Sequence, residues 1–323
     1  MPTLHRRQAT LLLAALAFSA AATAQGRFPD RPITFVVPFA AGSATDQLAR
    51  ALGHSLTEQT RQQVLIENRA GASGMLAAQA AARAPADGHT VLITTNTTHA
   101  ANEHLFRRLP YDPVRDFAPV TGLGKGGQVL VVRADAPFRT VADLVTRARQ
   151  QPGKLSFGSG SSSSRVAGEM LKQLAGIDVL HVPFRSNPLA LTDLIGGHID
   201  FMVTDTATGL PLVRAGQLRA LGVSTSRRIP LLPEVPTIDE AGVRGYDMGF
   251  WFAAYVPTGT PQPVVVRLNE LLHSAVRSAT ARSFFDTSGV EAWVSSPDEL
   301  ARFQVAETQK WGRVIRAAGI EPE

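Results

Sequence analysis

Two short loops of small residues hold the groups with which this chain could do chemistry. The first loop, residues 40–45, reads AAGSAT, and the second, residues 158–164, reads GSGSSSS. Each loop follows an apolar stretch and leads into a segment with apolar residues at helical spacing. The first amides of a helix lack an intrahelical acceptor and lie at the positive end of its dipole. Such a helix start binds carboxylates and phosphates, and serine hydroxyls supply further donors.

Both loops also have simpler interpretations. The first could be a plain strand-to-helix turn capped by Thr45 or Asp46. The second could be a flexible linker, since runs of glycine and serine are often linkers. It is short and lies between periodic segments, however, which favours a loop joining a strand to a helix.

The elements that position these loops alternate between strand and helix patterns along most of the chain. Strands are predicted at residues 33–38, 63–67, 90–95, 128–133, 155–157, 179–184, 199–203 and 218–224. Helical patterns separate most of them, and Asn187 is expected to cap one helix just before Pro188. This alternation predicts an α/β fold with mostly parallel sheets.

The N-terminal segment, from Met1 to Ala24, has the features of a signal peptide. The basic pair Arg6 and Arg7 precedes an apolar run from Ala9 to Ala22, and an A-x-A cleavage site ends at Ala24. An apolar run of that length is too short to span a bilayer. We therefore predict cleavage after about Ala24 and a periplasmic location.

The composition excludes several classes of protein. The chain has no cysteine, which rules out disulfides, zinc thiolates and a thiol nucleophile. Removing Arg6 and Arg7 lowers the formal net charge from +5 to +3, and the other basic residues are scattered, so no nucleic-acid partner is expected. The chain that follows Ala24 is long enough for two domains, and its small positive excess suits an anionic ligand.

Motifs of other enzymes and binding proteins are incomplete. Residues 122–127 read GLGKGG and match G-x-G-x-x-G, but a strand rather than a helix is predicted after them. The histidines show no metal-ligand spacing, and we expect neither a metal nor a cofactor. There is no G-x-S-x-G motif. A serine hydrolase using a serine of residues 159–164 stays open, because catalytic groups assemble in space.

Several longer stretches together resemble one known family. They include PITFVVPFAAGSATDQLAR (32–50), FGSGSSSSRVAGE (157–169), VPFRSNPLALTDLIGGHIDFMVTD (182–205) and WFAAYVPTGTP (251–261). With others between them, they follow in order through nearly all of the chain after the signal peptide. The chain thereby resembles the Bug family, the extracytoplasmic solute receptors of tripartite tricarboxylate transporters.

The resemblance implies a two-lobed α/β fold of the type II periplasmic-binding-protein kind, which closes on its ligand like a flytrap. The first lobe would comprise residues 27–125 and 253–323, and the second lobe would comprise residues 126–252. The implied function is a receptor that presents a small carboxylate to a tripartite tricarboxylate-type permease or to a sensor. The ligand would be a di- or tricarboxylate, an amino acid or an aromatic acid. We expect a monomer without enzymatic activity; the alternative is a secreted serine hydrolase acting on a carboxylate or an ester.

The resemblance also implies which residues contact the ligand. They belong to the first loop, the loop after residue 94, the Gly/Ser loop, and two later strand segments. The implicated residues are Phe39, Ala41, Gly42, Ser43, Asp46, Thr95, Asn96, Thr97, Ser159, Ser161, Ser162, Ser163, Asp205 and Trp251, with Phe252 beside Trp251.

Several features depart from the family pattern or leave alternatives open. Ser43 stands where many family members have a second glycine, and the Gly/Ser loop is about two residues shorter than usual. Arg165 stands where a histidine is common, and could bond a ligand acid or point to solvent. Asp205 either pairs with an ammonium group or a bridging water, or caps the following turn. Trp251 could line the cleft or belong to the core.

Overall fold

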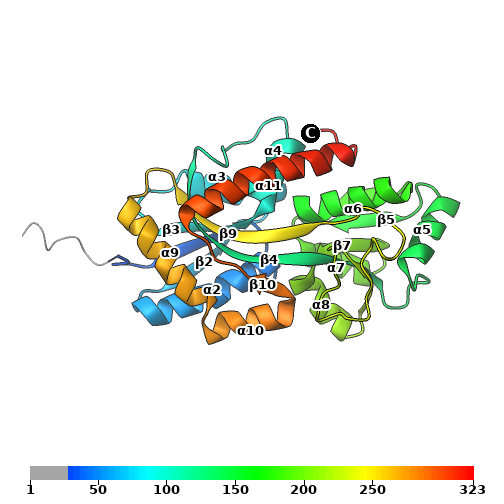
Figure 1. Ribbon diagram of the computed structural model, residues 1–323, viewed down its shortest axis with the longest axis horizontal. Coiled ribbons are helices and arrows are strands. Elements are labelled where there is room, and N and C mark those ends of the chain that lie inside the picture. The colour runs from blue at the N-terminus through cyan, green and yellow to red at the C-terminus, as the bar shows by residue number, and fades with distance from the viewer. Residues whose placement is uncertain (1–27) are drawn as a thin grey trace, which may run out of the picture.

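The computed structural model describes residues 28–323, and the predicted signal peptide at residues 1–24 lies outside them. Within the described part, no helix is both long enough and apolar enough to cross a membrane. Two β-sheets share the long strand β4 (Phe117–Arg133), and helices cover both of them. Figure 1 shows β4 and β9 (Gly249–Pro257) running between the two halves of an elongated molecule.

The first sheet is built mainly from the N-terminal part of the chain. Its strand order is β2-β1-β3-β9-β4, and β10 also pairs with β4. The bounds are β1 (Ile33–Val37), β2 (Val64–Asn68), β3 (Thr90–Thr95) and β10 (Val290–Ala292). β1 is parallel to β2 and β3, whereas β9 is antiparallel to both β3 and β4.

The second sheet has the strand order β4-β7-β5-β6, and β8 also pairs with β4. The bounds are β5 (Ser156–Ser159), β6 (Leu180–Pro183), β7 (Phe201–Asp205) and β8 (Leu218–Val223). β5 is parallel to β6 and β7, while β4 is antiparallel to β7 and β8. The parallel pairing expected from the sequence thus holds for the outer strands, whereas the strands that link the sheets pair antiparallel.

Strand β4 changes partners in its middle. Residues up to Gly127 pair with β9, and residues from Gln128 onward pair with β7. The segment after the GLGKGG motif is a strand, as predicted, and the motif itself belongs to the same strand. Its glycines make room for aromatic rings, because a Cβ on Gly126 would lie 2.7 Å from the ring of Phe250 and one on Gly122 2.4 Å from that of Trp293. The glycine pattern here serves packing and not dinucleotide binding.

The helices fall into three groups. Those associated with the first sheet are α2 (Ala44–Thr60), α3 (Met75–Ala82), α4 (Asn102–Leu105), α9 (Gln262–Val276) and α10 (Ala279–Ser288), together with the short turns η1 (Ala72–Gly74) and η2 (Thr97–Ala101). Those associated with the second sheet are α5 (Val141–Gln150), α6 (Ser162–Ala175), α7 (Asn187–Ile195) and α8 (Thr206–Arg214). The long helix α11 (Pro297–Ala317) contacts β4, η2 and α6, and so lies against both halves (Figure 1).

The core follows from the apolar periodicities of the sequence. Phe35 of β1 and the leucines of α2, Leu48 and Leu52, are fully buried in one cluster. The carboxyl ends of β1, β3, β5 and β7 point toward the junction of the two sheets. The loops that follow these strands therefore face one another. The carboxyl ends of such strands are where open α/β sheets bind ligands.

Candidate functional site

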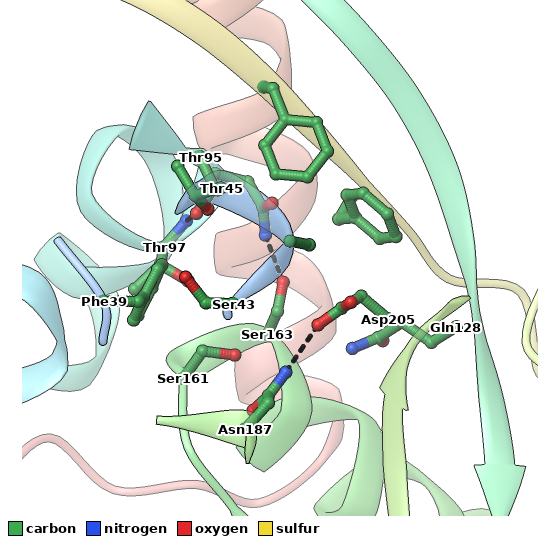
Figure 2. Close-up of a pocket in the computed structure, with 14 residues that line it drawn as sticks. Phe39, Ser43, Thr45, Thr95, Thr97, Gln128, Ser161, Ser163, Asn187 and Asp205 are labelled. Atoms are coloured by element: carbon green, nitrogen blue, oxygen red, sulfur yellow. Dashed lines mark hydrogen bonds between the residues drawn. The ribbon is translucent and has the colours of Figure 1, made fainter. Parts of the chain in front are cut away.

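A pocket lies where these strand ends converge, and its empty space, counted together with the solvent at its mouth, is about 400 Å³. Figure 2 shows its lining, which comes from the loops after β1, β3 and β5 and from β4, α7, β7 and β9. The lining residues are Phe39, Ser43, Ala44, Thr45, Thr95, Asn96, Thr97, Gln128, Ser161, Ser163, Asn187, Asp205, Phe250 and Phe252.

The first loop delivers the start of α2 to the pocket. Ser43 is the N-cap, and its Oγ accepts a hydrogen bond of 3.3 Å from the Asp46 amide. The amides of Ala44 and Thr45 lie in the first turn of α2, so no carbonyl of the helix can accept a hydrogen bond from them. Both residues line the pocket. Free donors at the positive end of a helix dipole therefore border the space where a ligand can bind.

Asp46 holds the first loop together and does not line the pocket. Its carboxylate accepts hydrogen bonds from the amide of Gly42 at 2.9 Å and from Asn68 Nδ2 at 3.0 Å, and it pairs with Arg50 at 2.9 Å. Burial would raise the pKa of Asp46, but the bonds from these three groups outweigh it and lower the pKa below its usual value. Ala41 and Gly42 are exposed and also lie outside the lining.

The Gly/Ser loop delivers the start of α6 from the second sheet. Ser161 is the N-cap and forms a capping box with Ser164, in which the Ser161 Oγ accepts from the Ser164 amide at 3.2 Å. Ser163 follows as an early helical residue, so its amide has no intrahelical acceptor and its side chain reaches the pocket. The linker interpretation is wrong, because this segment is an ordered helix start.

Close packing explains why residue 160 in this loop is a glycine. A Cβ on Gly160 would lie 1.9 Å from the carbonyl carbon of Ser186. The Gly160 amide donates to Asn187 Oδ1 at 3.1 Å. Ser186, and not Asn187, is the N-cap of α7, which leaves the Asn187 side chain free to bridge the loop and Asp205.

Ser159 and Ser162 are turned to other partners. Ser159 Oγ lies 2.7 Å from His181 Nε2, and its residue is only 4% exposed. Ser162 Oγ donates to Asn102 Oδ1 at 2.7 Å, a bond between the second and first halves of the molecule. Neither serine is part of the pocket lining.

The loop after β3 meets the Gly/Ser loop across the pocket. Asn96 Nδ2 donates to Ser163 Oγ at 2.6 Å, while Asn96 Oδ1 accepts from the Trp251 amide at 3.3 Å. Thr95 Oγ1 accepts from the amide of Thr97 at 3.1 Å. The Thr97 hydroxyl is buried and has no hydrogen-bond partner among the described residues. It is therefore available to a ligand.

Asp205 is both a helix cap and part of the pocket. It is the N-cap of α8, and its Oδ1 accepts from the amide and the hydroxyl of Thr208 at 2.9 and 2.8 Å. Its Oδ2 accepts from Asn187 Nδ2 at 2.8 Å, as Figure 2 shows. Burial raises the pKa of Asp205 above its usual value, against the opposing effect of these donors. The capping interpretation accounts for these bonds, and the residue also lines the pocket.

Trp251 faces away from the pocket, while its neighbours Phe250 and Phe252 line it. Successive side chains of a strand point to opposite faces. Phe250 and Phe252 therefore share one face of β9, and Trp251 lies on the other. The Trp251 indole donates to Glu307 Oε2 at 3.1 Å and packs on Phe303 with ring centroids 5.5 Å apart. Of the two aromatics expected at the cleft wall, Phe252 lines the pocket and Trp251 does not.

Arg165 adopts neither of the two roles considered for it. Its guanidinium Nη1 lies 2.7 Å from Glu323 Oε1, and its side chain is 18% exposed. The segment at Glu323 is itself held by a bond from its amide to the Leu105 carbonyl, at 2.9 Å. Arg165 therefore links α6 to the end of the chain instead of lining the pocket.

The structure thus brings together nine of the residues that the sequence implicated. They are Phe39, Ser43, Thr95, Asn96, Thr97, Ser161, Ser163, Asp205 and Phe252. The other six lie outside the lining: Ala41, Gly42, Asp46, Ser159, Ser162 and Trp251. Sequence reasoning missed Ala44, Thr45, Gln128, Asn187 and Phe250 as lining residues. Ala44 and Thr45 could have been found from the helix start, but nothing local marks Gln128.

Comparisons with known proteins agree with this architecture. Residues 48–320 match the family model described as the tripartite tricarboxylate transporter family receptor. The chain is similar to R. palustris Rpa4515, solved with adipate, at 36% identity and a TM-score of 0.89 over 92% of this chain and 100% of that one. It is similar to the periplasmic binding protein BugD at 28% identity and a TM-score of 0.88, again over 92% and 100%. MatC from Rhodopseudomonas palustris, with bound malate, is 32% identical with a TM-score of 0.84 over 89% and 100%.

Proposed function

The chain belongs to the tripartite tricarboxylate transporter receptor family, and we propose that it captures a small carboxylated solute in the pocket between its two sheets. The resemblance to the Bug family and the type II binding-protein fold are both confirmed by these matches. The chain is a solute-binding receptor of that family. The residues that hold its ligand, and the ligand itself, are proposals.

One observation carries the assignment of the pocket. The capped starts of α2 and α6 follow strands of different sheets and border the same space, the first through Ala44 and Thr45 and the second through Ser161 and Ser163. Their first amides have no intrahelical acceptors, and the hydroxyls of Thr97 and Ser163 lie beside them. Hydrogen bonds from such donors to a carboxylate are about twice as strong as those between neutral groups.

The charges of the lining suit an acid bound through neutral donors. Among the 14 residues lining the pocket in the described part of the chain, none is arginine, lysine or histidine. We therefore propose that helix dipoles, amides and hydroxyls hold the ligand carboxylate, and that no side-chain cation pairs with it.

We propose that the two halves are lobes that open and close around the ligand. The first lobe comprises residues 27–125 and 253–323, and the second lobe comprises residues 126–252. Two observations support these bounds: β4 changes partners between Gly127 and Gln128, and β9 begins at Gly249, opposite Gly127. A ligand that touches both helix starts favours the closed arrangement.

A receptor fits the pocket better than a serine hydrolase does. The hydrolase needs a nucleophile beside a base and in contact with the substrate. Ser159 and His181 form a close pair, but Ser159 is almost fully buried and does not line the pocket. We therefore propose binding without chemical conversion. A periplasmic location and delivery to a membrane permease of the tripartite type belong to the same proposal.

The test is to identify ligands and then follow their fate. Thermal-shift and calorimetric screens of purified protein over di- and tricarboxylates, amino acids and aromatic acids should yield at least one stabilising acid. Mass spectrometry of the material released on denaturation should recover that acid unchanged. Measured turnover of the acid would overturn the receptor assignment, and the absence of any stabilising acid would overturn the carboxylate assignment.

A further inference from the structure

We propose that the ligand carries, besides its carboxylate, a hydrogen-bond donor that binds between Gln128 and Asp205. An ammonium group is preferred there over a hydroxyl. This inference rests on the proposed function, because it concerns the other end of the same ligand. It makes Gln128 and Asp205 the residues that decide which acids this receptor accepts.

The two residues are neighbours because of strand pairing. β4 and β7 are antiparallel, and Gln128 lies directly opposite Asp205 in their register. Residues directly opposite one another in an antiparallel pair point to the same face of the sheet, with their Cβ atoms close together. Both side chains line the pocket, and Figure 2 shows them on the side away from Phe39, Ser43 and Thr97.

Gln128 has an unused acceptor in this position. The residue is 1% exposed, and its Oε1 is buried with no hydrogen-bond partner among the described residues. Buried polar atoms are rarely left without a partner, because such an atom loses its bonds to water and gains nothing in return. The oxygen can therefore accept a hydrogen bond from a donor that a ligand brings.

Asp205 adds acceptor capacity and charge at the same place. An ionised carboxylate has about four lone-pair sites, and the described residues supply three donors, two from Thr208 and one from Asn187. It is the one acidic side chain among the pocket-lining residues of the described chain, and that lining supplies no cation to balance it. A buried charge without a partner is unfavourable, and a ligand ammonium would pair with it.

The pocket is therefore polarised along its length. The helix starts at Ala44 and Ser162 offer donors, which suit a carboxylate, while Gln128 and Asp205 offer acceptors. A plain diacid would place a second anion beside Asp205, where like charges repel. An amino acid, or less well a hydroxy acid, complements both ends.

Matched acids test the proposal by calorimetry on the whole protein at neutral pH. The sets are succinate, malate and aspartate; glutarate, 2-hydroxyglutarate and glutamate; and propanoate, lactate and alanine. Within a set only one substituent changes, from hydrogen to hydroxyl to ammonium. In a set that binds, the amino acid should bind at least about tenfold tighter than the unsubstituted acid. One hydrogen bond to a charged group contributes enough free energy for that difference in affinity. The hydroxy acid should fall between them.

Each other outcome has a meaning. If the unsubstituted acid binds as tightly as both relatives in every set that binds, the donor requirement is wrong while the receptor function stands. If the hydroxy acid binds tightest, the donor requirement stands and the preference for ammonium is wrong. If no acid of any set binds but another acid of the broad screen stabilises the protein, the receptor function stands and this inference is wrong. If no acid binds at all, both are wrong.

Two variants assign the effect to its residues. Asp205→Asn removes the charge but keeps a side chain that caps α8 well, so the helix should stay intact. The affinity ratio of amino acid to unsubstituted acid should then fall about tenfold. Gln128→Met keeps the length but removes the polar atoms, and should lower the ratio of hydroxy acid to unsubstituted acid. Unchanged ratios in both variants would overturn the assignment.

Asp286→Asn is the control for charge loss, because Asp286 is exposed on α10 and lies outside this pocket. It should leave all ratios as they are. Melting temperatures of the three variants distinguish a lost contact from lost folding.

Discussion

Asn96 Nδ2 and Ser163 Oγ lie 2.6 Å apart and join the first sheet to the second directly at the pocket. The same asparagine accepts a hydrogen bond from the backbone of β9, so it is fixed on the side of the first sheet. The described arrangement is therefore a closed one, in which the loop after β3 already touches the start of α6. Opening the pocket requires this bond to break.

We expect Ser163→Ala to weaken ligand binding by two mechanisms, loss of a ligand contact and loss of the bond to Asn96. The combined effect should be about 1–3 kcal/mol, since each hydrogen bond contributes about 0.5–1.5 kcal/mol net. Ser162→Ala removes only the bond to Asn102 and should cost less affinity. Titration calorimetry of both variants, with Ser283→Ala on the exposed face of α10 as the control, measures the difference. Equal losses in all three would contradict the closed arrangement described here.

We expect Ser43→Asp to weaken carboxylate binding strongly while α2 stays intact. Aspartate is a good N-cap, so the helix start is kept, but its charge lies where the ligand carboxylate binds. Two like charges about 4 Å apart repel by about 4 kcal/mol near a protein surface, which is enough to abolish micromolar binding. Ser43→Asn has the same shape and caps without charge, and should lose far less affinity. Similar affinities for the two variants would place the carboxylate elsewhere.

We expect a bound acid to stabilise the fold and to compact it. A ligand that binds only the folded state adds about 2.7 kcal/mol at a hundredfold excess over Kd. For a protein of this size that corresponds to several degrees in Tm, at about 2–4 °C per kcal/mol. X-ray scattering should show a smaller radius of gyration with ligand than without. A stabilising acid that leaves the scattering curve unchanged would indicate a receptor that is closed before it binds.

We expect Asp46 to make stability fall at acid pH. Its pKa is lowered in the folded protein, so the stabilisation is fully present well above the usual pKa near 4. It is lost as the pH falls through the lower, folded-state pKa. Asp46→Asn should therefore lower the free energy of unfolding at pH 7 and flatten its dependence on pH below about 4. Denaturant melts of both proteins from pH 7 to pH 3 make this comparison; parallel curves would contradict it.

We expect Gly160→Ala to be far more destabilising than Gly176→Ala. A Cβ at residue 160 would lie 1.9 Å from the backbone of Ser186, so the loop and α7 must separate. Gly176 has φ +60° and nothing within 4 Å of such a Cβ, so alanine there costs only the strain of a left-handed backbone, about 1 kcal/mol. Thermal melts should rank the variants in that order. If Gly160→Ala folds normally, it should still weaken ligand binding through the displaced Ser161 and Ser163.

The sequence by itself determined most of the elements and the order strand, loop, helix at the two helix starts. Leucines at i, i+4 spacing specify the buried face of α2, and the serine run specifies the start of α6, because such signals need only a few consecutive residues. The cap of α2 was expected at Thr45 or Asp46 and is Ser43. The strand after the GLGKGG motif was likewise correct. These features are local, so a single sequence contains them.

Only the tertiary structure decided which side chains face the pocket. Gln128 reaches the pocket because β4 pairs with β7 at a register that places it opposite Asp205, and strand register is set by residues far apart in sequence. Trp251 and Phe252 lie on opposite faces of β9, and the sheet against which that strand packs selects the face. Asp46 and Ser162 were also predicted to contact the ligand. In the structure Asp46 is hydrogen-bonded to Asn68 and Ser162 to Asn102, and neither lines the pocket. Such choices depend on which surfaces meet when the chain folds, and that is a property of the assembled packing and not of any short segment.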